Sequence, residues 1–169
     1  MTLGRLASQA ILLLSALLLM ATANAQQEAR ISDLSRLDRQ YMAQQRESLD
    51  DLASANLGRR FSGNKQNDLE ILQLLLDRRL VRADQTRELQ AMGVIMGDLL
   101  AADLSMHWVI YEDAVGRTRA LRYRQSQEYL FPITMIARRQ EADNQTPVAM
   151  IYQKAYDIID PLRPELPFR

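Results

Sequence analysis

The chain has 169 residues, with 21 basic side chains, 21 acidic side chains, one histidine and no cysteine. This length is enough for one domain with its own core, and the balanced charge argues against a protein that coats nucleic acid. The lack of cysteine excludes disulfides and thiol catalysis, and because His107 is the only histidine, the sequence predicts no metal site and no cofactor.

The first 25 residues have the pattern of a secretory signal peptide. Arg5 supplies the positive charge, a leucine-rich run covers about residues 10–21, and Ala23-Asn24-Ala25 matches an A-x-A cleavage site. The run is shorter than the roughly 18 residues that span a bilayer. We therefore expect cleavage and export to the periplasm or the medium, with no transmembrane segment left in the mature chain. An uncleaved membrane anchor is the alternative.

Residues 26–66 predict a helix followed by a loop. Apolar residues recur at helical spacing from Ile31 to Ala55, with charged residues and glutamines between them. Gly58 is expected to cap the end of this helix. The stretch RRFSGNKQN that follows predicts a loop.

Two further helices are predicted next. Asn67 would cap one whose apolar stripe includes Ile71 and Leu75, and Asp84 would cap another that runs to about residue 103. These caps would set the start of each helix.

The second of these helices contains Gly93 and Gly97, which are four residues apart and so share one face. Each glycine weakens a helix by about 1 kcal/mol relative to alanine. The pair therefore predicts close backbone packing against another element, with a ligand on that face as the alternative.

The pattern changes to strands after His107. Trp108–Tyr111 and Arg117–Arg124 predict the arms of a hairpin whose turn is Asp113-Ala114-Val115-Gly116. Phe131–Ala137 alternates and predicts a third strand, at the edge of the sheet because Pro132 has no N–H to donate.

A last helix is expected from Thr146-Pro147, with threonine as the cap and proline in the first helical position. Residues 161–169 contain three prolines and predict an extended tail. The order predicts an α+β fold with N-terminal helices, a three-stranded antiparallel β-meander and a C-terminal helix. We expect a single domain over residues 67–160.

The hairpin carries two adjacent acids, Glu112 and Asp113. Successive strand side chains leave opposite faces, so the two are poorly placed as general acid and base. Asp113 and Gly116 are explained as the first and last residues of the turn. We expect a bulge at Gly116 that pairs Asp113 with Arg117; a two-residue loop, which pairs Glu112 with Arg117, is the alternative.

Arginines gather on the hairpin and after the third predicted strand. In a meander, Arg119, Arg122 and Arg138 could converge, and guanidinium groups prefer carboxylate or phosphate ligands. A solvated sheet face, with Trp108 in the core, explains the same residues without a ligand. The candidate binding residues are Trp108, Glu112, Arg117, Arg119, Arg122, Arg138 and Arg139.

The stretch ELQAMGVIMGDLLAADLSMHWVIYEDAVGRTRALRY, followed by FPITMIARR, resembles a bacterial family known as domain of unknown function 3806. The pattern joins a glycine-bearing helix, a strand tryptophan, an acid, a Gly-Arg turn, an Ala-Leu-Arg strand and a Phe-Pro segment that ends in basic residues. The resemblance covers roughly residues 67–156 and leaves the N-terminal helix outside. It implies a single domain and supplies no catalytic residues. The matching positions are Gly93, Gly97, Trp108, Asp113, Gly116-Arg117, Ala120-Leu121-Arg122, Phe131-Pro132 and Arg138-Arg139.

Three functions are compatible with the sequence. We expect a non-enzymatic domain that binds an envelope protein or an anionic ligand, through the arginine-bearing sheet face or the N-terminal helix. One alternative is a hydrolase-like enzyme for an anionic envelope substrate, with Glu112 or His107 as base, although the sequence has no G-x-S-x-G motif and no Walker A loop. The other is a structural protein that oligomerises through Ile31–Ala55.

Overall fold

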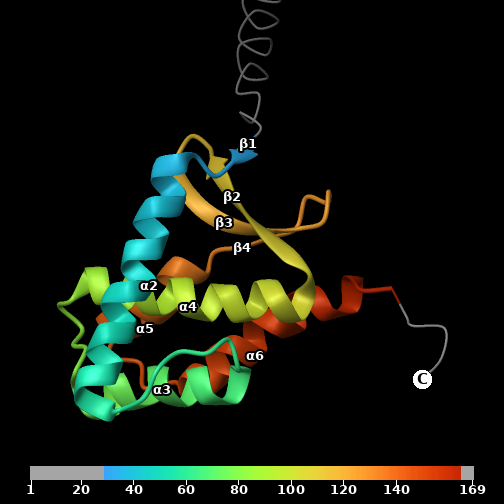
Figure 1. The fold of residues 1–169 in the computed structure, drawn as a ribbon. Coiled ribbons are helices and arrows are strands. Elements are labelled where there is room, and N and C mark those ends of the chain that lie inside the picture. Colours follow the sequence, from blue (N-terminus) through green and yellow to red (C-terminus); the bar gives the residue numbers. More distant parts are fainter. Residues whose placement is uncertain (1–28, 165–169) are drawn as a thin grey trace, which may run out of the picture.

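The structure is a computed structural model that describes residues 29–164. The predicted signal peptide and residues 165–169 of the predicted tail lie outside the described part. The described chain forms one antiparallel sheet of four strands in the order β1-β2-β3-β4, together with helices that pack beside and below it (Figure 1). The α+β class is confirmed, and the sheet has one strand more than the three expected.

The elements have the following bounds. The strands are β1 (Arg30–Asp33), β2 (Met106–Glu112), β3 (Arg117–Tyr123) and β4 (Tyr129–Leu130). The helices are α2 (Arg36–Leu57), α3 (Lys65–Asp77), α4 (Thr86–Leu104), α5 (Met135–Glu141) and α6 (Val148–Ile159). Two 3-10 turns cover Pro132–Thr134 and Asp160–Leu162.

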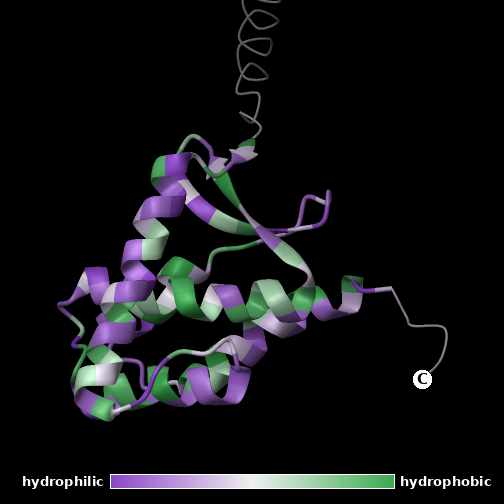
Figure 2. Ribbon diagram, in the orientation of Figure 1, coloured by the Kyte–Doolittle hydropathy of each residue, from purple (hydrophilic) through white to green (hydrophobic). Residues whose placement is uncertain are grey.

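Helix α4 is the centre of the core. It contacts the sheet, α2, α3, α5 and α6, and most of its residues are buried. A helix that is apolar on nearly all sides is expected in such a position. In Figure 2 apolar residues line α4 and the helix surfaces that face it, while the outer surface of α2 is mostly polar.

The N-terminal segment differs from the prediction. Ile31 lies in β1, which pairs with β2, rather than in a helix. The helix begins only after Ser35, whose hydroxyl accepts the Asp38 backbone N–H while the Asp38 carboxylate accepts the Ser35 N–H. This reciprocal capping box fixes the start of α2 at that point.

Helix α2 also belongs to the core of the fold. Met42, Leu49 and Ala53 are buried, and the helix packs against α4. The segment that the family resemblance left outside therefore shares the same core as the rest of the chain.

Of the four predicted helix caps, the one at Gly58 is right and those at Asn67, Asp84 and Thr146 are wrong. Gly58 ends α2 with a left-handed φ of 64°, as expected. Asn64 rather than Asn67 caps α3. Helix α4 starts after Gln85 rather than Asp84, and the Asp84 carboxylate pairs with Arg82.

Helix α6 also starts later than predicted. Its cap residue is Pro147, so Val148 is the first helical residue. The Thr146 hydroxyl donates to the Asn144 side chain instead of capping the helix.

The hairpin has the alternative register, and the expected bulge is wrong. Glu112 pairs with Arg117, and the Asp113 N–H donates to the Gly116 carbonyl across a two-residue loop. This register places Leu121 and Tyr123 on the sheet face that packs on the helices. Because a shift by one residue would move both to the opposite face, core packing decides the register.

The third predicted strand is wrong. Only Tyr129–Leu130 pairs with β3, and the chain then forms a 3-10 turn and α5. Pro132 suits the first position of a helical turn, and Ile136 and Ala137 are buried neighbours on one helix. Arg138 and Arg139 therefore lie on α5 and not at the end of a strand.

The prediction of close packing at Gly93 and Gly97 is confirmed. A Cβ atom at Gly93 would lie 2.6 Å from the backbone of Ile133, and one at Gly97 would lie 2.4 Å from the Trp108 ring. At both positions a neighbouring group would have to move to admit a side chain. The two glycines therefore allow the sheet and the Pro132–Thr134 turn to lie directly on α4.

Candidate functional site

Two of the predicted binding arginines converge, but they do so on a residue of the protein itself. Arg117 and Arg119 on β3 both reach Asp38 in the first turn of α2, with N–O distances of 2.7 and 2.8 Å. The Asp38 side chain is only 4% exposed. This cluster attaches α2 to the sheet.

The surroundings of Asp38 favour its charged form. The hydrogen bond from Arg117 is the main cause that lowers the pKa of Asp38 well below its usual range, and hydrogen bonds from Ser35 act in the same direction against the effect of burial. The same contact raises the pKa of Arg117. Both groups are therefore ionised at neutral pH.

Arg119 is enclosed by α2. Its guanidinium lies 4.7 Å from the centroid of the Tyr41 ring. Its Nε and the Gln45 Oε1 are buried atoms without a hydrogen-bond partner in the described part of the chain. Arg119 therefore holds α2 on the sheet and is not open to a ligand.

Arg122 and Arg139 bind backbone carbonyl groups. Arg122 lies on the opposite face of β3 from Arg117 and Arg119 and donates to the carbonyls of Gln125 and Ser126, which closes the loop between β3 and β4. Arg139 donates to the Met135 carbonyl at 2.6 Å within α5. The five predicted arginines thus do not share one recess.

Trp108 also has a structural explanation. Its ring lies against Gly97, and its Nε1 donates to Asp98 at 2.9 Å. Asp98 in turn accepts two hydrogen bonds from Arg46. The tryptophan thus connects β2, α4 and α2.

The two candidate bases lie far apart. His107 is the second residue of β2 and Glu112 is the last, so about 17 Å of strand separates them. Both are exposed. They cannot act on one substrate atom together.

A hollow of about 530 Å³ lies beside the hairpin turn, and we call it the hairpin hollow. Its lining contains two arginines, two threonines and two aromatic rings, from β2, β3, α5 and the segment before it. Tyr111 and Phe131 are packed edge to face, with centroids 5.2 Å apart. The lining residues are Tyr111, Asp113, Val115, Gly116, Arg117, Thr118, Phe131, Thr134 and Arg138.

The charges in the hairpin hollow favour an anion. Arg138 is exposed and has no hydrogen bond or ion pair with another described side chain. Arg117 uses one side of its guanidinium for Asp38, yet its side chain remains 47% exposed. The Asp113 carboxylate accepts the Val115 and Gly116 N–H groups. The lining therefore contains Arg138, which has no ion-pair partner among the described residues, and Arg117, which is half-exposed, and both could contact an anion.

Several side chains of this region were not among the binding residues predicted from the sequence. Thr118 and Thr134 offer hydroxyl groups to the hollow, and Tyr111 offers a ring with a hydroxyl. Asp38 could be recognised as a capping residue from the Ser35-x-x-Asp38 spacing. Its two arginine partners, however, come from a strand about eighty residues later, and no local pattern indicates them.

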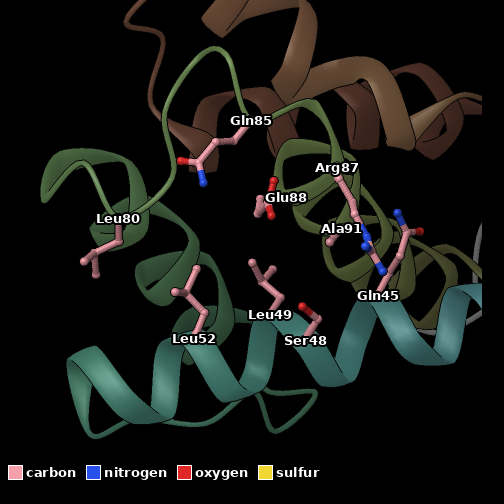
Figure 3. Close-up of a pocket in the computed structure, with 9 residues that line it drawn as sticks. All are labelled: Gln45, Ser48, Leu49, Leu52, Leu80, Gln85, Arg87, Glu88 and Ala91. Carbon is pink, nitrogen blue, oxygen red and sulfur yellow. The ribbon is translucent and has the colours of Figure 1, made fainter.

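A second recess lies between α2 and the start of α4 (Figure 3). It holds about 120 Å³, and its lining includes Leu49 and Leu52 on α2, Leu80 on the segment before α4, and the polar side chains of Gln85 and Glu88. This volume is much smaller than that of the hairpin hollow. It contains none of the predicted binding residues.

Among residues 29–164, no group of three or more His, Asp or Glu side chains is arranged to hold a metal ion. No helix in that same part is long and apolar enough to cross a membrane.

Comparison with known proteins gives a family and a fold. A family model described as a domain of unknown function (DUF3806) matches residues 68–152, which are 85 of the 169 residues. No curated protein matches. A crystal structure from Bacteroides thetaiotaomicron VPI-5482 is similar, with a TM-score of 0.70 and 19% identity over 80% of this chain. The match covers 50% of that protein, so the likeness shows the shared fold alone.

Proposed function

The chain belongs to the DUF3806 family, which is defined by a domain of unknown function, and we propose a function based on the candidate site of this chain. The protein is an exported, non-enzymatic domain of the bacterial envelope that binds an anionic group in the hairpin hollow. Export rests on the signal-peptide pattern of residues 1–25.

One observation carries the binding proposal. Arg138 lacks an ion-pair partner among the described residues, and it lines the same hollow as the half-exposed Arg117 and the aromatic residues Tyr111 and Phe131. Guanidinium groups bind carboxylates and phosphates with paired hydrogen bonds. A ligand with an anionic group and an apolar part suits this lining.

The geometry gives less support to catalysis. His107 and Glu112 lie at opposite ends of β2, and neither lines the hairpin hollow. The lining carboxylate, Asp113, already accepts two backbone N–H groups. A general base poised over a bound anion is therefore lacking among the described lining residues.

Oligomerisation through the N-terminal helix also receives little support. The apolar residues of α2 that would form a coiled-coil stripe, such as Met42 and Leu49, are buried within the domain. Helix α2 contacts α4 instead of presenting these residues to a second chain.

Phenyl phosphate is a suitable probe, because it joins an anion to an aromatic ring. We expect it to shift the NMR signals of Tyr111, Phe131 and Arg138, whereas phenol, its neutral analogue, should bind far more weakly. R138Q should weaken phenyl phosphate binding at least about tenfold, since a charge-assisted hydrogen bond contributes about 1.5–3 kcal/mol.

The matched control is R124Q, because Arg124 is also exposed but lies in the loop between β3 and β4. It should bind phenyl phosphate like the unmodified chain. Equal affinity of R138Q and the unmodified chain, or shifts that map elsewhere, would contradict the proposed site.

A further inference from the structure

Among residues 29–164, the two most exposed large apolar side chains lie at one end of the fold. Val115 is 96% exposed and Leu37 is 76% exposed. Val115 is in the β2–β3 turn, and Leu37 precedes Asp38, which binds Arg117 at the start of β3. The start of α2, the β2–β3 turn and the start of β1 lie together in Figure 1, and we call this region the hairpin end.

Arginines surround these two apolar residues. Five exposed arginines belong to the hairpin end or the hollow next to it, whereas its exposed acids are Asp33 and Glu112. Apolar side chains that project among basic residues are typical of a surface that lies on anionic lipid. The five arginines are Arg30, Arg36, Arg39, Arg117 and Arg138.

The N-terminal segment joins the folded domain at this end. Strand β1 starts at Arg30, and only residues 22–29 separate it from the apolar run of residues 10–21. Eight residues span at most about 29 Å. A signal segment inserted in a bilayer would therefore lie within about 29 Å of the hairpin end.

We propose that the hairpin end binds the surface of an anionic phospholipid bilayer. Leu37 and Val115 enter the boundary between headgroups and acyl chains, and the hairpin hollow receives a lipid phosphate between Arg117 and Arg138. This inference rests on the proposed function, because it assigns the anionic group in the hollow to a lipid headgroup. A small soluble anion would use the hollow but would leave Leu37 and Val115 without a role.

Vesicle flotation tests the inference with the chain from Gln26 to Arg169, which contains every described residue. Vesicles of phosphatidylcholine mixed with phosphatidylglycerol should carry the protein, and vesicles of phosphatidylcholine alone should carry much less. V115D should lower the partition coefficient at least about tenfold, because it places a charge where an apolar side chain enters the lipid. R138Q should lower it about fivefold, the typical effect of one basic residue near an anionic surface.

The matched controls are M150S and I158S, which remove exposed apolar side chains from α6, away from the hairpin end. They should leave flotation unchanged. Flotation that V115D does not reduce, or that M150S reduces equally, would overturn the lipid contact.

Phenyl phosphate binding separates this inference from the proposed function. If phenyl phosphate binds in the hollow but the vesicles do not carry the protein, the lipid contact is wrong and the anion site remains. If the vesicles carry the protein and V115D abolishes this, but phenyl phosphate does not bind, the anion site is wrong and the contact through Leu37 and Val115 remains.

Discussion

Asp38 is the residue on which the junction between α2 and the sheet depends. It is the only acid in contact with Arg117 and Arg119 among the ion pairs of the described residues. It also completes the capping box with Ser35. Removal of its charge would leave two guanidinium groups beside an apolar interface.

We expect D38N to lower the free energy of unfolding by about 3 kcal/mol. This value is at the lower end for breaking a buried ion pair, because Arg117 is half-exposed and can recover contact with water. Urea denaturation measures the change. Asp33 is exposed on β1, so D33N should change the free energy by less than about 0.5 kcal/mol.

The same carboxylate makes stability depend on pH. The pKa of Asp38 is lower in the folded state than its ordinary value, mainly through Arg117. The stabilisation is therefore complete above the unfolded pKa of about 4 and is lost as the pH falls from there through the folded pKa. Urea midpoints should fall below about pH 4 more steeply in the unmodified chain than in D38N. Parallel curves for the two proteins would contradict this assignment.

Helix α4 lies close to the sheet and to the Pro132–Thr134 turn because Gly93 and Gly97 have no side chains. The nearest atoms to a Cβ at Gly93 belong to the backbone of Pro132 and Ile133, whereas a Cβ at Gly97 first meets the Trp108 ring. A side chain at Gly93 would have to displace the backbone of the Pro132–Thr134 turn, whereas a side chain at Gly97 could be accommodated by rotation of the Trp108 ring.

G93A should therefore destabilise the protein by about 2 kcal/mol, since the overpacking outweighs the gain in helix propensity. G97A should instead displace the ring of Trp108, the only tryptophan, and alter its fluorescence. A102G, at an exposed position of α4, is the control and should cost about 1 kcal/mol. A G93A variant as stable as the unmodified chain would show that the turn does not rest on the helix.

Sequence periodicity predicted the long helices and the hairpin, because those elements have local patterns. It missed β1, since Ile31 fits either an amphipathic helix or a strand and only distant pairing with β2 decides between them. It also took Phe131–Ala137 for a strand, where contact with Gly93 selects a helical turn. Short segments whose conformation depends on distant partners are the ones that a single sequence leaves undetermined.

The candidate site shows the same limit. Arg117 and Arg138 were predicted and do line one hollow. Arg119 was predicted too, but its partner Asp38 lies far away along the chain, so the arginine's structural role was not visible. Arg122 and Arg139 bind carbonyl groups whose positions follow from loop and helix geometry.

The folded core of the molecule includes more of the chain than the family model matches. The family model begins at residue 68, whereas β1 and α2 precede it and cover β2 and α4. Removal of these two elements would expose core side chains of α4 that lie beside α2 and its loop, such as Ile95 and Leu99.

We therefore expect residues 65–169 alone to lack a cooperative urea transition, while residues 26–169 unfold in one step. Burial of Met42, Leu49 and Ala53 supplies several kcal/mol, which is comparable to the net stability of a small domain. Circular dichroism during urea titration distinguishes the two fragments. Cooperative unfolding of the shorter one would show that the N-terminal elements are an addition to a complete domain.

The sheet ends in strands of four and two residues, β1 and β4. Each offers few unpaired backbone groups to a strand from another molecule, which limits edge-to-edge aggregation. Recognition by strand addition is equally restricted at these edges. We therefore expect this domain to recognise the side-chain or charged groups of a partner, and not a backbone strand added to the edge of its sheet.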